Sequence, residues 1–560
     1  MSRKPTGTRT RSARPRLAAA WAAFLAASAL ASLSVSPALA DPDPNALSPA
    51  KTLERVAAED SSRSESALAE ARALADAKKF DEAARILRAR LAQAPEDADA
   101  QSLLARVLAW GRHYDESIAE YRKILAAHPD DAFDRAGYAR VLAWSGRSEA
   151  SLREFRRAVR ADSTDLESRV GYARALSWAG DLPGASTEYR GILSSNPAYG
   201  DAWLGYATVA RWRGAPSSSD RFLERAAHGS ADTEAMGQER RAVRDALGPS
   251  IGAGLTTAHE RQYVAAAPDF AIESTGPFAQ ARATLARAAT VTVRVSRLAQ
   301  FERRLGPPVL GTTLNYDLDM TVLRADAALT RGYPFLLSAG VESRAIQAGS
   351  PNVIYPLRGD DRFFGWNARA WGFAGRWTPS ASVRRDYVPI KDDTGLPEIR
   401  AGRQTVVAGE LAYQWNARAT LSAGAEHGSY SDENDRSTLR AGAAYRLRLA
   451  RPGLSADYGI SFTDFDSSSA SYFTPLKSTR HAAGLALTGY SERASLDWGA
   501  RYQFSAVLSS NFDNIYTSTW SGWVNLVAGG SFPLGLEGSY SRDNNAYETW
   551  FVGASGAVRW

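Results

Sequence analysis

Apolar positions between residues 64 and 233 recur at helical spacing, and the pattern repeats every 34 residues. Four sets of side chains follow this step in register: Ala71, Ala105, Ala139, Ala173 and Ala207; Trp110, Trp144, Trp178 and Trp212; Tyr121, Phe155 and Tyr189; and Pro95, Pro129 and Pro197. The period predicts five stacked helical hairpins, at 64–97, 98–131, 132–165, 166–199 and 200–233, followed by a connecting helix and linker at 234–249.

From residue 250 the spacing changes to two, which predicts strands separated by Gly, Pro, Asn, Asp and Ser. One face of each strand is apolar and aromatic, and the other is charged; in 314–322 we place Met320 on the apolar face and Asp317 and Asp319 on the charged face. Sixteen strands are expected, near 250–259, 278–287, 289–302, 312–323, 334–347, 363–377, 380–389, 401–415, 419–430, 437–449, 454–465, 481–490, 494–507, 518–532, 534–542 and 549–560.

This alternation fits two architectures: a soluble sandwich or propeller with the apolar face inside, or a transmembrane barrel with that face toward lipid. The barrel is favoured because aromatic residues recur near strand ends and tight turns alternate with long polar loops. The chain also ends in an alternating apolar set that resembles the C-terminal signal read by the barrel-insertion machinery, with Trp550, Val552, Val558 and Trp560 as its main residues.

A barrel must close, because backbone groups cannot stay unpaired in lipid, and about sixteen strands leave a wide interior. Its lumen is expected to be wet or ion-paired, and in one alternative the charges satisfy one another and plug it. The lumen candidates are Asp317, Asp319, Arg369, Glu410, Glu426, Arg440, Arg446, Arg448, Asp457, Asp497, Arg501 and Glu537.

The first forty residues carry six basic and no acidic side chains, then an apolar run and the small-residue site Ala38-Leu39-Ala40. This is the pattern of a secretory signal peptide at 1–40, with an uncleaved anchor as the alternative. Residues 41–63 are expected to be a linker and helical lead-in. Without the first forty residues the chain has 61 basic and 61 acidic side chains, so its charge gives no reason to bind nucleic acid.

The 34-residue period resembles the tetratricopeptide repeat, whose first helices line a concave groove. By that resemblance Arg72, Arg106, Arg140 and Arg174 face the groove, one turn before Trp110, Trp144, Trp178 and Trp212. Such a surface would suit an extended acidic or ring-bearing ligand, a polysaccharide or a peptide. In the alternative interpretation, the tryptophans pack between repeats and the arginines pair with acidic neighbours such as Asp134 or Glu167.

The sequence does not predict an enzyme. Gly248-Pro249-Ser250-Ile251-Gly252 matches a hydrolase pattern, but a helix precedes the serine where that pattern needs a strand. The chain has no cysteine, and its six histidines do not show metal-ligand spacing. We therefore expect no catalytic residue, no metal and no cofactor.

The predicted fold is multidomain α + β: an α-solenoid of tetratricopeptide repeats, then a closed antiparallel transmembrane β-barrel of about 16 strands at 250–560. This order resembles periplasmic-repeat outer-membrane proteins that export biofilm polysaccharides such as cellulose and poly-N-acetylglucosamine, and the barrel resembles the YaiO-type family. The phrase Val-Leu-Ala-Trp at 107–110 and 141–144 carries part of the likeness. Five repeats are few for an exporter, and a modifying domain is not expected.

The resemblance implies residence in the outer membrane of a Gram-negative bacterium, with the repeats in the periplasm. Its implied partners are outer-membrane lipid, the insertion machinery, a polysaccharide, and periplasmic or inner-membrane secretion proteins. We expect the barrel to conduct a polymer that the repeats gather. The alternative is a closed barrel anchor whose repeats scaffold envelope protein assemblies.

Overall fold

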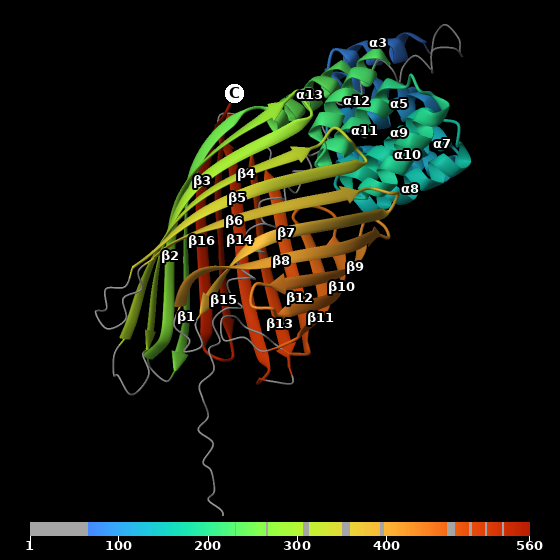
Figure 1. Ribbon diagram of the computed structural model, residues 1–560. Coiled ribbons are helices and arrows are strands. Elements are labelled where there is room, and N and C mark those ends of the chain that lie inside the picture. The colour runs from blue at the N-terminus through green and yellow to red at the C-terminus, as the bar shows by residue number, and fades with distance from the viewer. Residues whose placement is uncertain are drawn as a thin grey trace, which may run out of the picture.

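The computed structural model describes residues 65–229, 231–264, 267–305, 313–349, 359–391, 397–467, 476–491, 495–509, 512–528 and 531–560. The signal peptide expected at 1–40 and the lead-in at 41–63 lie outside these residues. Figure 1 shows a stack of helices at one end of a barrel of strands. No helix among the described residues is both long enough and apolar enough to cross a membrane.

The helical domain consists of consecutive antiparallel helices. They are α3 (Glu65–Asp76), α4 (Phe80–Gln93), α5 (Ala98–Trp110), α6 (Tyr114–Ala127), α7 (Ala132–Trp144), α8 (Ser148–Ala161), α9 (Leu166–Trp178), α10 (Leu182–Ser195), α11 (Gly200–Trp212), α12 (Pro216–His228) and α13 (Thr233–Leu247). Aspartates one period apart begin three of the first helices: the carboxylates of Asp97, Asp131 and Asp165 accept hydrogen bonds from backbone amides of α5, α7 and α9. Such caps satisfy amides that have no partner inside the helix.

The core of the helical domain is built on aromatic rings that meet glycines. Tyr121, Phe155 and Tyr189 are almost fully buried. A Cβ atom added to Gly205 would lie 2.2 Å from the Tyr189 ring, and Phe155 packs on its own glycine in the same way. Each ring therefore fills the space where the next first helix carries no side chain, which joins neighbouring repeats.

The barrel is closed and antiparallel, with each strand paired to its neighbours in sequence and β1 paired to β16. Its strands are β1 (Ser250–Val264), β2 (Ala267–Leu285), β3 (Ala289–Leu305), β4 (Thr313–Leu329), β5 (Phe335–Gly349), β6 (Gly359–Gly372), β7 (Trp377–Lys391), β8 (Pro397–Gln414), β9 (Ala419–Tyr430), β10 (Asp435–Arg448), β11 (Gly453–Phe465), β12 (Ser478–Ser491), β13 (Leu496–Leu508), β14 (Ile515–Ala528), β15 (Phe532–Asp543) and β16 (Tyr547–Arg559). These strands and the preceding helical repeats confirm the predicted fold class.

The two faces of the barrel wall are identified by contacts that skip a strand. Arg384 on β7 lies 3.7 Å from Glu426 on β9, across β8, so this face is the concave inner one. The opposite face carries exposed apolar side chains, for example Leu439 at 60% and Leu485 at 50% exposure. The apolar side of the sheet therefore faces outward and the charged side encloses the lumen, as the transmembrane interpretation requires.

The helical domain contacts one rim of the barrel, which we call the docked rim. It comprises the turns at 286–288, 330–334, 373–376 and 415–418 and the rim-side end of β10. The other end is called the far rim (Figure 1). Each strand therefore has a near half, next to the helices, and a far half.

Candidate functional site

The junction between the domains is a buried polar and apolar interface. Ser218 Oγ donates a 2.9 Å hydrogen bond to the Thr330 carbonyl oxygen, and Thr330 Oγ1 donates one of 2.8 Å to Ser217 Oγ. Tyr333 is buried against Tyr206 and Phe222, with ring centroids 5.8 and 6.4 Å away. Since one cluster of buried side chains extends across both domains, the helices are fixed on the rim.

One turn of the fourth repeat lies at the mouth of the lumen. The Asp181 side chain, only 3% exposed, accepts hydrogen bonds of 3.1 to 3.2 Å from the Arg376 guanidinium. Gln414 Nε2 donates to the Gly180 carbonyl oxygen at 2.7 Å, and Arg446 Nη1 donates to the Ala179 carbonyl oxygen at 2.9 Å. Because Gln414 and Arg446 belong to the inner face of the wall, residues 179–181 cover part of the opening.

Nine of the twelve lumen candidates lie on the inner face. Their neighbours in sequence, such as Leu411, Leu439, Tyr458 and Leu536, are exposed on the outer face. The nine are Arg369, Glu410, Glu426, Arg440, Arg446, Asp457, Asp497, Arg501 and Glu537. The placement of Arg448 in the lumen was wrong, because the register of β10 shifts before it and pairs it with Leu454, a residue of the outer face.

Asp317 and Asp319 lie on the outer face, so their placement in the lumen was wrong. Met320, the residue after Asp319 on β4, is 3% exposed and points inward. Asp319 pairs with Arg297 on β3, whose Nε lies 3.0 Å from the carboxylate. The error has a physical reason: apolar side chains fill the far half of the lumen at β4, so the usual alternation is reversed there.

The inner charges differ between the two halves of the barrel. Toward the far half, the Glu426 carboxylate forms ion pairs with three arginines: Arg436, Arg384 at 3.7 Å and Arg440 at 3.5 Å. Among the described residues, four near-half candidates on the inner face have no ion-pair partner: Arg369, Glu410, Asp497 and Glu537. The mouth beside the helices therefore presents unneutralised charges of both signs.

The far half of the lumen contains an apolar filling along β2 to β8. Ile272, Met320, Ile346, Phe363 and Val406 all point inward and are at most 3% exposed. At the far rim, Val388, Tyr430 and Phe465 form a further buried cluster. The lumen is thus polar and charged near the helices, and more apolar along one side toward the far rim.

Of the four arginines of the groove ladder, Arg106 is buried, and Arg72, Arg140 and Arg174 are half-buried. Arg106 is 6% exposed, lies over the Phe133 ring at 5.3 Å and has one terminal nitrogen without a hydrogen-bond partner. Arg140 lies 2.9 Å from Glu167, the pairing named in the alternative interpretation. Arg72 and Arg140 each also have an unpartnered buried Nε. The space beside Arg106 and Arg140 measures about 10 Å³, enough for about one water molecule.

Burial changes the titration of groups around this ladder. It lowers the pKa of the Arg106 guanidinium, and Arg72 and Arg140 add to that effect. Burial also raises the pKa of the Tyr121 hydroxyl, and it raises the pKa of Tyr189 to about 12. The groove floor is therefore a tightly packed charged layer.

The tryptophan ladder packs between repeats. Trp110 and Trp212 are buried, and Trp144 is half-buried against two adjoining apolar clusters. Trp178 is also half-buried. The arginines and tryptophans of the ladders thus lie on the same helices, but little of either set reaches the surface as a contact face.

The terminal strand completes the barrel wall. Val552, Val558 and Trp560 are exposed on the outer face, and Trp550 stacks on His259 of β1 at a centroid distance of 5.6 Å. The residues expected to form an insertion signal are therefore also the outward face of the closing strand.

Two features were missed by reasoning from the sequence. One is the glycine ladder Gly137, Gly171 and Gly205, which has the same period of 34 and lies against the aromatic ladder. The other is a pocket of about 450 Å³ between α6, α7 and α8. The glycine signal was visible in the sequence, whereas the pocket depends on which side chains leave space between helices.

Comparison with solved structures finds fold likeness at low identity. A bacterial polysaccharide outer membrane secretin is 12% identical with a TM-score of 0.39, covering 55% of this chain and 98% of its own. YrrB, a tetratricopeptide-repeat protein with an unusual peptide-binding site, is 18% identical with a TM-score of 0.25, covering 35% and 99%. PilF of Pseudomonas aeruginosa is 17% identical with a TM-score of 0.28, covering 32% and 82%. No family model and no curated protein matches the chain.

Proposed function

We propose that the chain is an outer-membrane conduit that passes a polysaccharide, with the helical repeats in the periplasm at its entrance. The observation that carries the proposal is the near half of the lumen. There a closed wall with an apolar outer face encloses unpaired charges of both signs, among them Arg369, Glu410 and Asp497. Mixed, hydrated charges bind a passing polymer weakly at many points, which allows release as well as entry.

The position of the repeats supports a role at the entrance. They contact turns from β2–β3 to β8–β9 and the end of β10, so they cover one side of the docked rim. The contacts to Thr330 and Asp181 are buried. A polymer reaching the lumen from that side would first meet the repeat domain.

The test is single-channel conductance of the purified full-length protein in planar bilayers. A conduit gives steady openings whose size changes with salt concentration. Replacing the near-half charges in Arg369→Gln and Glu410→Gln should change the ion selectivity of those openings. Absence of openings from a folded barrel would reject the conduit.

A closed anchor with scaffolding repeats is the second candidate. It is favoured by the far-half filling, in which Met320, Phe363 and Val406 are buried inside the wall. Conductance measured on the variants Met320→Ala and Phe363→Ala distinguishes the two candidate functions. In a conduit already open these raise conductance, whereas in a closed anchor conductance stays absent in both the parent protein and the variants.

A further inference from the structure

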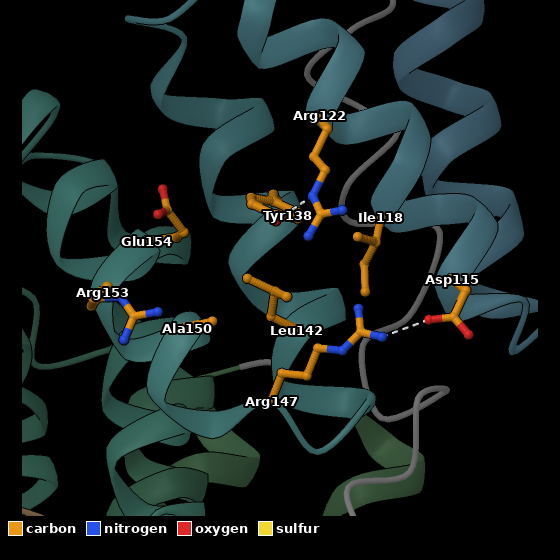
Figure 2. Close-up of a pocket in the computed structure, with 9 residues that line it drawn as sticks. All are labelled: Asp115, Ile118, Arg122, Tyr138, Leu142, Arg147, Ala150, Arg153 and Glu154. Atoms are coloured by element: carbon orange, nitrogen blue, oxygen red, sulfur yellow. Dashed lines mark hydrogen bonds and ion pairs between the residues drawn. The ribbon is translucent and has the colours of Figure 1, made fainter.

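A pocket of about 450 Å³ lies between consecutive second helices of the repeats, α6 and α8, with α7 behind them. Figure 2 shows Arg122 and Arg147 reaching toward it from opposite sides, with Ile118 and Leu142 between them. Its main lining comes from second helices, so it is separate from the groove formed by the first helices. A pocket of this size is in the range that binds small organic ligands.

The charges of this pocket are unbalanced. Asp115 pairs with Arg147 at 2.7 Å. Glu154 is already paired with two arginines outside the set, Arg135 at 2.8 Å and Arg157 at 2.9 Å. Arg122 and Arg153 are exposed and have no ion-pair partner among the described residues, so two guanidiniums face the pocket without a counter-charge.

The repeat period supplies a comparison within the same chain. One repeat earlier, Arg88 occupies the position of Arg122 and is paired with Glu116 at 2.6 Å. The position of Glu116 is occupied in the next repeat by Ala150, so the counter-charge is lost there. The position of Arg153 is Ala119 in the earlier repeat, so a second positive charge is gained. Relative to the earlier repeat, both differences raise the positive charge at this pocket.

The remaining lining indicates the shape of the ligand. Ile118, Leu142 and Ala150 form an apolar floor, and the Tyr138 hydroxyl accepts a 3.3 Å hydrogen bond from Arg122 Nε. An apolar floor with a phenol suits the carbon-bound faces of a sugar ring, while guanidiniums bind carboxylates through paired hydrogen bonds. A free inorganic anion would leave this floor uncovered.

We propose that the pocket between α6, α7 and α8 binds an acidic sugar residue, with Arg122 and Arg153 attracting its carboxylate from two sides of the pocket (Figure 2). This proposal rests on the proposed function, because it identifies the polymer that the barrel conducts as one that carries uronate residues. The site would hold one residue of the polymer on the outer side of the solenoid before the chain enters the barrel.

The experiment measures binding of tetragalacturonate to the full-length protein in detergent by calorimetry. Cellotetraose serves as the neutral probe and inorganic phosphate as the free anion. We expect tetragalacturonate to bind, more weakly as salt rises, and the other two not to bind. Ala150→Glu restores the counter-charge present one repeat earlier and should weaken binding about tenfold to a hundredfold, as should Arg122→Gln with Arg153→Gln.

Arg88→Gln is the matched control, since it removes an arginine at the equivalent position that is already paired. It should leave binding unchanged, and helical circular dichroism verifies that each variant is folded. Equal binding of cellotetraose or phosphate, unchanged binding in Ala150→Glu and in the double variant, or an equal loss in Arg88→Gln would each overturn the proposal. Conductance recorded on the same preparations separates this outcome from failure of the conduit.

Discussion

The helical domain and the barrel use apolar side chains in opposite directions. In the helices Leu87 and Tyr189 are fully buried among neighbouring repeats, whereas in the barrel Leu439 and Leu485 are at least half exposed. The inner face of the barrel carries charged residues in the near half of the lumen, and apolar side chains fill part of its far half. Water therefore surrounds the helical core, and lipid is required to cover the barrel. The difference shows that the same types of apolar side chain are placed inside one domain and outside the other, according to whether water or lipid surrounds that domain.

The largest expected effect tests the dry helical core. Tyr189→Ala removes a ring that is fully buried against Gly205, and should lower the free energy of unfolding of the helices by about 3–5 kcal/mol. Thermal melts followed by helical circular dichroism measure the loss. Barrel melting should stay unchanged, and a loss below 1 kcal/mol (about a fivefold change in equilibrium) would contradict the packing described.

The next effect tests the outer face of the barrel. Leu439→Arg places a charge on the lipid side and should destabilise the barrel by about 2–4 kcal/mol in lipid. Ala444→Arg, on the inner face of the same strand, is the matched control and should cost much less. Unfolding in urea from lipid vesicles measures both. Equal costs would mean that the two faces are assigned wrongly.

A third effect appears on alkaline titration of the helices. The pKa of Tyr189 is raised to about 12 by burial, while a tyrosine in the unfolded chain ionises near 10. Between pH 10 and pH 12 the unfolded state binds fewer protons than the folded state. The contribution of Tyr189 to the free energy of unfolding is therefore fully present below pH 10 and is lost as the pH rises toward 12. The loss from this group should reach about 2–3 kcal/mol near pH 12. Tyr189→Phe should reduce the fall by this amount, and the other buried tyrosines of the helices account for the remainder. Tyr445→Phe, on the outer face of the barrel, should leave the melting of the helices unchanged.

The smallest effect concerns the junction. Arg376→Ala leaves the buried Asp181 carboxylate without its guanidinium and should weaken docking of the helices by about 1–2 kcal/mol. Arg331→Ala, an exposed arginine on another turn of the same rim, serves as the control. Protease cleavage between Leu247 and Ser250 measures the loosened domain. If both variants were cleaved at the parent rate, the Asp181 contact would not hold the domains together.

Much of this fold was predictable from the sequence because both patterns are strictly periodic. The step of 34 located the helices, and alternation located the strands, although β14 begins at Ile515, three residues before its predicted start. Alternation failed at β4, where Leu318 and Met320 point inward and Asp319 points out. A period of two fixes which residues share a face but does not reveal which face is outside when the lumen itself contains apolar filling.

The candidate site was less predictable, for a different physical reason. The positions of Arg106 and Trp110 on a first helix followed from the period. Their burial could not be predicted, because it depends on packing that the period does not describe, such as the contact of Arg106 with the Phe133 ring. The junction at Asp181 could not be foreseen either. It joins residues almost two hundred positions apart, and no repeat or alternation connects them.

The docking of the helices on successive hairpins has a consequence for biogenesis. Partners of the helical domain are spread from Arg282 to Arg446, over more than half of the strands, and they lie in β2, in four turns and at the ends of β8 and β10. The complete set of partners exists only after these hairpins have assembled beside one another. Full docking of the helical domain therefore requires that this part of the barrel wall has formed, and the docked helices then hold these turns beside one another.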